Sequence, residues 1–185
     1  MRFAIGAVSV VDGNTSSGAE TMDERVANKH LTALIEKWHA SLVLFARQWI
    51  EAEAEDIVQD AFLRYLKKLR KDDPKEIENP AAWLFRVVRN ESVSRVRRRN
   101  LINRHSEKIG ATQKNWFEPQ HEQKLDADEL ADKLAALPME LREVLIPRLW
   151  GNLTFEEIGN ITETSQSSAH RRYHEALQIL KDSFR

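Results

Sequence analysis

The spacing of apolar residues restricts the fold more than any other feature of this sequence. In two stretches they recur at steps of three and four, which places them on one face of an α-helix. The first stretch, about residues 30–50, carries Leu31, Leu34, Ile35, Trp38, Leu42, Phe45 and Trp49. The second, about residues 55–70, carries Ile57, Val58, Ala61, Phe62, Tyr65, Leu66 and Leu69. A third helix is predicted to begin at the Asn79-Pro80 pair, which suits an N-cap and a first turn. Three such helices predict one compact unit.

Composition favours an all-α fold and excludes several kinds of site. The chain has 185 residues, of which 42% are hydrophobic, and only 6 Gly and 5 Pro. This supplies a core for one ordinary domain or two small ones, with helices preferred. Because cysteine is absent, the chain has no disulfide, thiolate metal site or Cys nucleophile, which fits a reducing compartment. No apolar run approaches the length of a membrane span. We therefore expect a cytoplasmic protein without membrane insertion.

The first residues lack the features of a secretion signal. The segment "MRFAIGAVSVV" has one Arg and a short apolar run, and no small-residue cleavage site follows. The next segment, "DGNTSSGAET", is polar, so residues 1–28 are predicted to form a flexible tail. The sequence leaves open whether translation starts at Met1 or Met22.

The apolar periodicity fades between residues 101 and 125, where polar residues mix with Gly and Pro as in a flexible linker. Trp116 and Phe117 stand out there, and both docking on a partner and packing against a flanking domain remain open. We therefore predict two small helical domains, residues 29–100 and residues 126–185, joined by this linker.

The second domain contains signals for two short helices joined by a tight turn. Pro138 is predicted to open a helix, and Pro147 to kink it or end it early. Thr154 and Glu157 form a capping box for a short helix from Phe155, and Ser165 is a predicted cap for the last helix. Small polar and basic side chains near the start of that helix suit contacts with DNA: Ser167, Ser168, His170, Arg171, Arg172 and His174. A helix pair of this kind enters the major groove in many DNA-binding proteins, although simple packing also produces it.

Charge is unevenly distributed although the formal net charge is only -1. The segment "EAEAEDIVQD" holds five acids and no base, whereas residues 86–108 hold eight bases against two acids. Any single charge run is often no more than a solvated helix face. Basic and acidic blocks on one chain indicate a protein that touches nucleic acid and also meets a protein partner.

Both halves together resemble the extracytoplasmic-function sigma factors of the bacterial sigma-70 family. The first half resembles their promoter-melting domain through "AEDIVQDAFLRYLKKL" and "NPAAWLFRVVRNESVSRVRRR". The second resembles their C-terminal domain through "LPMELREVL" and "LTFEEIGNIT". The resemblance implies a non-enzymatic transcription initiation factor whose partners are core RNA polymerase and promoter DNA. Members of this family often have an anti-sigma factor, and the sequence leaves open whether this chain has one.

The resemblance also implies roles for particular residues. The polymerase clamp is expected to contact Asp56, Gln59, Asp60 and Arg64. The non-template strand of the -10 element is expected to contact Trp83, Arg86, Arg89, Asn90 and Arg97. A melted strand needs apolar or aromatic surface beside its bases and positive charge along its backbone. Arg95, Arg98 and Arg99 are also expected to neutralise phosphates, whereas Trp83 taken alone is better explained as a core residue.

The predicted recognition helix departs from the common family pattern. Many members have Gly in the turn and a Gly-Thr-Val-(Lys/Arg)-Ser-Arg-like run, whereas this chain has Glu163 and Thr164 followed by "SSAHRR". Glu175 also occupies a position that is often basic. The promoter sequence therefore does not follow from the residues.

Two other functions compete with this interpretation. A free-standing helix-turn-helix regulator would bind duplex DNA without polymerase, but its first domain would have to sense a ligand or form dimers. An enzyme has little support, because the six His show no recognised metal-ligand spacing and no phosphate-cradling Gly loop occurs. We predict no cofactor and no metal.

Overall fold

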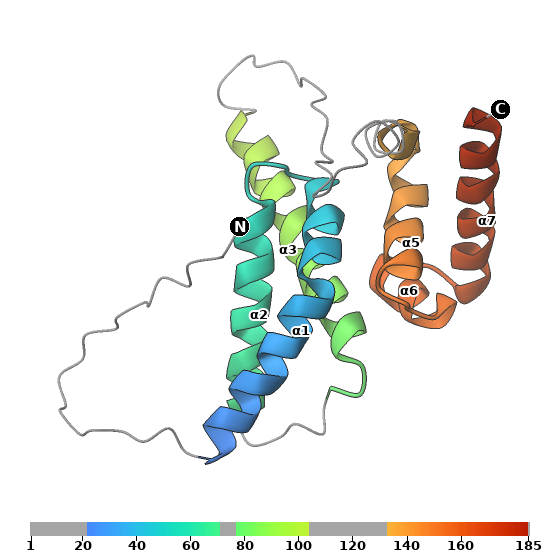
Figure 1. The fold of residues 1–185 in the computed structure, drawn as a ribbon. Helices are drawn as coiled ribbons and strands as arrows, with labels where there is room; N and C mark the ends of the chain where they lie inside the picture. Colours follow the sequence, from blue (N-terminus) through green and yellow to red (C-terminus); the bar gives the residue numbers. More distant parts are fainter. Residues whose placement is uncertain (1–21, 71–76, 104–132, 185) are drawn as a thin grey trace.

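The computed structural model describes residues 22–70, 77–103 and 133–184 (Figure 1). These residues form helices and the turns between them, with no strand in the described ranges. The all-α prediction is confirmed. Within the same residues, no helix is long and apolar enough to cross a membrane.

The first unit consists of α1 (Met22–Arg47), α2 (Ala54–Arg70) and α3 (Pro80–Asn103). Helix α1 begins at Met22, so the prediction of a tail as far as residue 28 is wrong for residues 22–28. That segment contains no Gly or Pro to stop a helix, and apolar spacing marks only the part of a helix that meets the core. Helix α3 likewise extends through residues 101–103, which were predicted as linker. The remaining tail and linker residues, including Trp116 and Phe117, lie outside the described residues.

The core of the first unit is built from all three helices. Its fully buried side chains include Leu42, Phe45, Ile57, Val58, Leu84 and Phe85. The rings of Phe45 and Phe85 meet edge to face, with centroids 5.1 Å apart. Burying each large apolar side chain stabilises the fold by about 1.5–3 kcal/mol. The predicted apolar stripes therefore do form one core.

Asn79 caps α3 as the sequence predicts. Its side-chain oxygen accepts hydrogen bonds from the backbone N–H groups of Ala81 and Ala82, at 3.0 and 3.3 Å. These are two of the donors that the first turn of a helix leaves without partners. The cap fixes where α3 begins, and thereby which residues of α3 face the core.

The second unit consists of a helical turn at residues 133–136, α5 (Met139–Leu149), α6 (Phe155–Thr162) and α7 (Gln166–Ser183). Helix α5 begins after Pro138, as predicted, and continues past Pro147 to Leu149. The carbonyl of Pro147 accepts a hydrogen bond from the backbone N–H of Leu153 at 3.2 Å, which ties the end of α5 to the following loop.

The caps predicted around α6 and α7 are both present. Thr154 and Glu157 form the reciprocal capping box of α6, and the Ser165 side chain accepts a hydrogen bond from the Ser168 backbone N–H at the start of α7. Glu163 ends α6 in the left-handed conformation, with φ 59°. That conformation favours Gly, so the Gly-free turn noted in the sequence carries a strained residue.

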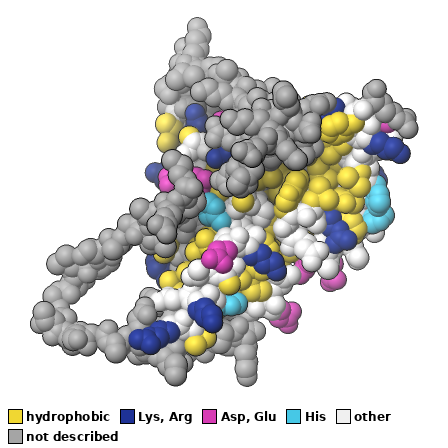
Figure 2. All heavy atoms as spheres, viewed as in Figure 1, with side chains coloured by type: hydrophobic (Ala, Val, Ile, Leu, Met, Phe, Trp, Pro, Cys, Tyr) yellow, Lys and Arg dark blue, Asp and Glu magenta, His cyan; other side chains and the backbone are white. Residues whose placement is uncertain are grey.

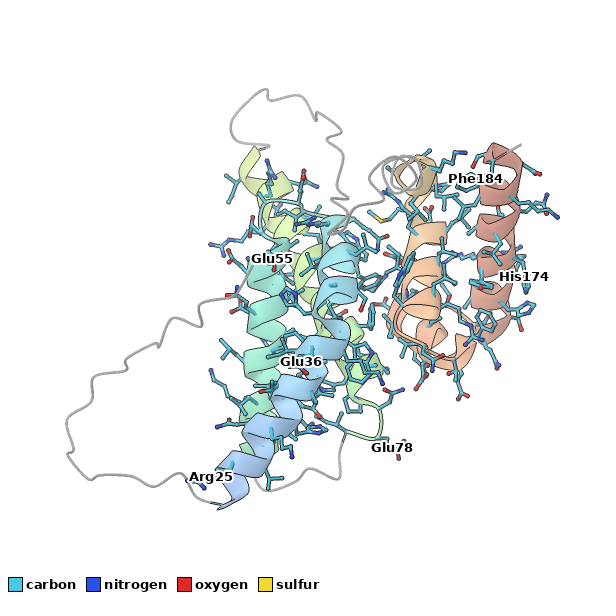
Figure 3. The ribbon with its side chains drawn as sticks, viewed as in Figure 1. Arg25, Glu36, Glu55, Glu78, His174 and Phe184 are labelled. Carbon is cyan, nitrogen blue, oxygen red and sulfur yellow. The ribbon has the colours of Figure 1, made fainter. Side chains whose placement is uncertain are left out.

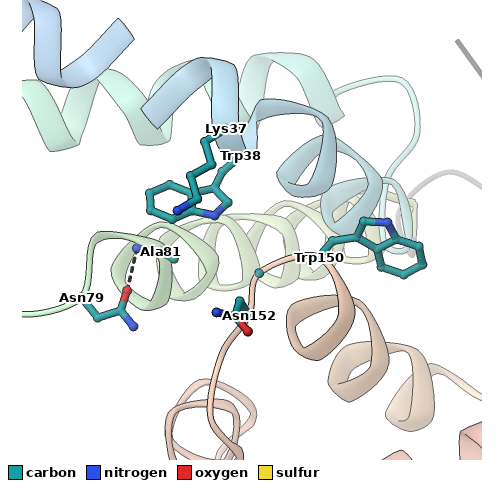
Figure 4. Close-up of a pocket in the computed structure, with 7 residues that line it drawn as sticks. Lys37, Trp38, Asn79, Ala81, Trp150 and Asn152 are labelled. Carbon is teal, nitrogen blue, oxygen red and sulfur yellow. Dashed lines mark hydrogen bonds between the residues drawn. The ribbon is translucent and has the colours of Figure 1, made fainter. Parts of the chain in front are cut away.

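The two units pack directly against each other, which the sequence did not predict. Helix α1 contacts α5 and α3 contacts α6, and buried apolar side chains from both units form one continuous cluster. The Asn79 side-chain amide donates a hydrogen bond to the Glu157 carboxylate across this junction. Figure 4 shows a small pocket at the same place, lined by residues of both units such as Trp38, Asn79 and Asn152.

A buried ion pair also joins the units. The Arg89 guanidinium on α3 lies 3.5 Å from the Glu143 carboxylate on α5, and these side chains are only 15% and 11% exposed. The same guanidinium lies 3.3 Å from the carboxylate of Glu163, which is 80% exposed. Burial raises the pKa of Glu143, and the positive charge of Arg89 acts in the opposite direction.

Gly151 lies where the two units approach each other closely. A Cβ atom at this position would be 2.6 Å from the Pro147 carbonyl oxygen and 2.7 Å from the Phe85 ring. Its φ is not positive, so the backbone conformation does not demand Gly. Gly is needed here because there is no room for a Cβ atom. We expect Gly151→Ala to lower the free energy of unfolding by about 1–3 kcal/mol, measured by urea denaturation.

The adjacent Asn152 provides the control for this substitution. It is exposed and has φ 52°, a conformation that Gly adopts without a Cβ penalty. Asn152→Gly should therefore change the free energy of unfolding by less than about 1 kcal/mol. Equal stability of Gly151→Ala and the parent would contradict the tight contact.

Glu143 provides a pH-dependent test of the junction. A carboxyl whose pKa is higher in the folded state than in the unfolded state contributes stability at low pH, and loses it as pH rises through the folded-state pKa. Because burial raises the pKa of Glu143, Glu143→Gln should remove this loss. Denaturation between about pH 5 and pH 8 should show the variant gaining stability relative to the parent as pH rises. A difference that is constant or falls with pH would contradict burial of this charge.

Candidate functional site

Helix α2 presents the residues predicted to meet the polymerase on its outer side. Asp56, Gln59 and Arg64 are exposed and Asp60 is partly exposed, while Ile57, Val58 and Ala61 of the same helix are buried. Asp56 lies in the first turn of α2, where the helix dipole favours a negative charge. The structure thus brings the four predicted residues onto one surface of the first unit.

Two of these residues belong to an ion-pair network that joins α2 to α3. The guanidinium of Arg95 binds three carboxylates: Glu53 at 2.8 Å, Asp60 at 3.0 Å and Glu91 at 3.1 Å. Arg64 binds the other oxygen of Glu91 at 2.9 Å. Arg95 therefore links the acidic surface of α2 to α3, and it is not free to neutralise phosphates as the sequence interpretation assumed.

The contacts within this network shift the pKa of two of its members, Glu91 and Arg95. Hydrogen bonds from Arg95, and secondarily from Arg64, lower the pKa of Glu91 despite partial burial. Hydrogen bonds from Arg95 to Glu53 and Glu91 raise the pKa of the guanidinium. The charges of Glu91 and Arg95 are thus retained near neutral pH, and Arg95 holds the Asp60 carboxylate at 3.0 Å.

Sequence reasoning missed Glu53, Glu91 and Arg95 as parts of this surface. One signal was present, because Glu91 and Arg95 lie four residues apart on one helix, a spacing that favours an ion pair. The contacts of Arg95 with Glu53 and Asp60 depend on how α2 packs against α3. No short sequence pattern predicts how these two helices pack together.

A second surface follows the exposed side of α3. At 100° per residue, Trp83, Arg86, Asn90 and Arg97 fall within about 60° of one another around the helix axis. Arg86, Asn90 and Arg97 are exposed. Trp83 is half-buried, and its ring packs edge to face against Tyr65 with centroids 5.6 Å apart. The structure therefore places an amide between two arginines, with an indole at one end that also belongs to the core.

Arg89 does not share this surface. It points toward the second unit, where it pairs with Glu143 and Glu163. Its Nε atom is buried and has no hydrogen-bond partner among the described residues. In this arrangement Arg89 is not exposed on the surface predicted to contact the -10 DNA strand.

The six residues of α7 that were predicted to contact DNA fall into two groups. Ser167, His170, Arg171 and His174 are exposed and share one face of the helix. Ser168 is partly buried, and its backbone N–H and side chain both bond to the Ser165 side chain in the cap. Arg172 is partly buried on another side, where its charge acts on Glu143.

The α7 face lies beside apolar surface. Figure 2 shows hydrophobic side chains gathered over the second unit, with His side chains at its edge. Exposed apolar residues of this unit include Leu149, Trp150, Ile179 and Phe184. No group of three or more His, Cys, Asp or Glu that could hold a metal occurs among the described residues.

Two family models match the chain. Residues 34–102 match Sigma-70 region 2, and residues 134–182 match Sigma-70 region 4. Together the matches cover more than half of the chain. The first contains the α2 and α3 surfaces, and the second contains the helix pair α6 and α7.

A known relative of this chain is also a sigma factor. The ECF RNA polymerase sigma factor SigE of Mycolicibacterium smegmatis is 29% identical over 135 residues, which cover 70% of this chain. The chain spans about half the length of that relative, since the match covers 51% of it.

Two solved structures share the fold. The sigma factor RpoE of Bartonella quintana, solved with the anti-sigma factor NepR, has a TM-score of 0.67 and 24% identity, covering 85% of this chain and 97% of its own. CnrH, solved with the cytosolic domain of CnrY, has a TM-score of 0.55 and 21% identity, covering 86% and 92%. With region 2 and region 4 matched in this order and an ECF factor as a relative, the chain belongs to the extracytoplasmic-function sigma factors of the sigma-70 family.

Proposed function

We propose that this chain is a transcription initiation factor that binds core RNA polymerase, directs it to promoters through -10 and -35 elements, and aids DNA melting. The observation that carries this proposal is the presence of three distinct exposed surfaces on one chain. They are the acidic surface of α2, the basic surface of α3 and the polar, basic face of α7. A protein with one nucleic-acid contact would need only one of them.

The α2 surface suits a protein partner. Asp56 and Gln59 are exposed, and Asp60 is held in place by Arg95. A negatively charged surface does not attract the phosphates of DNA, whereas it complements a basic surface on a protein. We assign Asp56, Gln59, Asp60 and Arg64 to the polymerase contact, with Arg95 as the residue that positions Asp60.

The α3 surface suits a melted DNA strand. Arg86 and Arg97 supply positive charge for the backbone, and the Asn90 amide can donate and accept hydrogen bonds at a base edge. Trp83 offers part of an aromatic ring at the same surface. Arg89 joins this set only when α3 separates from the second unit, because its guanidinium now contacts Glu143 and Glu163.

The α7 face suits the major groove of a duplex. Ser167, His170, Arg171 and His174 are exposed near the start of the helix, as in helix-turn-helix recognition. Arg172 is partly buried on the side of Glu143, which belongs to the same unit. Because Arg89 is held at the junction by Glu143 and Glu163, we propose that polymerase binding separates the units, so that each reaches its own promoter element.

The remaining partners and the setting follow from this role. The factor directs the polymerase and catalyses no reaction itself, and it acts in the cytoplasm, where the polymerase and the promoter are. We also propose that an anti-sigma factor binds this chain, by analogy with RpoE, whose structure was solved with NepR.

Promoter-dependent transcription in vitro tests the function. Purified protein is added to core polymerase and a library of promoter fragments, and the transcript start sites are sequenced. We expect starts downstream of a common pair of elements, and only when the protein is present. A protein that binds specific duplex sites but gives no transcripts would instead be a free-standing regulator, which the helix pair α6 and α7 would also allow.

Charge reversal tests the polymerase contact. Asp56→Lys should weaken binding to core polymerase at least about tenfold, because it places a positive charge in the proposed contact with a basic partner. Asp56 is exposed, so the fold should persist. Fluorescence anisotropy with labelled protein measures the affinity, and circular dichroism checks the helix content.

Glu36→Lys is the matched control, since Glu36 is an exposed acid on α1, outside the proposed contact. It should retain the affinity of the parent for core polymerase. Equal binding by Asp56→Lys and Glu36→Lys would remove the assignment of the α2 surface.

Removal of one amide tests the strand contact. Asn90→Ala should reduce promoter opening while leaving polymerase binding unchanged, because Asn90 is exposed and contributes no core volume. Loss of hydrogen bonds to one base predicts a reduction of roughly tenfold. Permanganate footprinting of the melted region measures the effect.

Ser94→Ala provides the comparison, as Ser94 is exposed one turn further along α3. Its footprint should match that of the parent. An Asn90→Ala footprint as strong as that of Ser94→Ala would mean that the amide does not contact the strand.

A further inference from the structure

Two imidazoles face each other on the exposed side of α7. The Nε2 atoms of His170 and His174 are 3.1 Å apart, and the ring centroids are 4.4 Å apart. The two residues are one helical turn apart, so the helix itself holds both rings on the same side. Figure 3 shows His174 on the outward side of α7.

Neighbouring aromatic rings orient the pair. The Phe155 ring on α6 packs edge to face against His170, with centroids 4.9 Å apart and an interplanar angle of 75°. Tyr173 packs edge to face against His174 at 5.5 Å and 80°. These contacts restrict the rotation of both imidazoles, so the Nε2 atoms converge without a third residue between them.

A hydrogen bond alone gives this arrangement little stability. One Nε2 must carry a hydrogen and donate it while the other accepts, and if both carried one they would repel. Both side chains are exposed, so water competes for the same atoms. The Nε2 atoms do, however, present two lone pairs toward one point when both rings carry their hydrogen on Nδ1.

That point fits a divalent transition-metal ion. With metal–nitrogen bonds of about 2.0–2.1 Å, two ligand nitrogens are roughly 3.4 Å apart at a tetrahedral angle and roughly 2.9 Å apart at a right angle. The observed separation of 3.1 Å lies between these values. Neutral imidazole is a common ligand of zinc, nickel and copper ions.

We propose that His170 and His174 form a two-ligand site for a divalent transition-metal ion, with water completing the coordination. The sequence interpretation found no metal site because two His fall short of any recognised motif, and the convergence of the Nε2 atoms is visible only in the structure. The site does not depend on the proposed function. An ion bound here adds positive charge to the face of α7 that carries Ser167 and Arg171.

Titration with metal salts tests the site in untagged, full-length protein. Isothermal titration with Ni²⁺ should show one ion bound per chain at this pair, and affinity should increase from Co²⁺ to Ni²⁺ to Cu²⁺. Mg²⁺ prefers oxygen ligands and should not bind the pair. The bound ion should also raise the thermal unfolding temperature, because it binds the folded helix more tightly than the unfolded chain.

Paired substitutions identify the ligands. His170→Ala with His174→Ala should weaken Ni²⁺ binding at least about tenfold and abolish the shift in unfolding temperature. Ala is a strong helix former, so α7 should persist, which circular dichroism checks. The control replaces the same number of His elsewhere, through His105→Ala with His121→Ala, and should bind Ni²⁺ like the parent. Unchanged affinity after loss of His170 and His174, or an equal loss in the control, would overturn the site.

Discussion

Helix α3 lies against three environments at once: the core of the first unit, the junction with the second unit, and solvent. The rest of the structure depends on this constraint. Leu84 and Phe85 fill the core of the first unit, and Phe85 also meets Gly151 of the second. Arg89 enters the junction between the units, while Asn90 faces outward. The mixture of apolar, amide and basic residues in this helix therefore follows from three adjoining faces, each with its own environment.

The local structure could be predicted from the sequence, because caps and apolar spacing act over a few residues. Asn79 caps α3, and Thr154 with Glu157 caps α6, as their sequence positions indicate. The start of α1 was missed because its first residues carry no core stripe. The approach of the second unit was missed for a different reason: a contact such as Arg89 with Glu143 joins positions far apart in the chain, and no short pattern encodes it.

The same distinction applies to the candidate site. Exposure of Asp56, Asn90 and Arg171 agrees with roles that need a free surface. In the sequence, Arg95 and Arg89 are two equivalent positive charges. In the structure, Arg95 is bound by three carboxylates of its own unit, whereas Arg89 is bound by two carboxylates of the other unit. Arg95 therefore supports the α2 surface, whereas Arg89 can be released by a rigid separation of the units.

We propose that this chain reads promoters only together with polymerase. Its electrostatic contact with duplex DNA is small, because Arg171 is exposed on α7 while Arg172 is partly buried near Glu143, and few phosphate contacts give weak binding. Gel-shift titration of a promoter duplex, with and without core polymerase, tests the claim most directly. We expect weak binding by the protein alone and tight, specific binding by the complex, in which both units act together. Equally tight, sequence-specific binding by the protein alone would contradict the account.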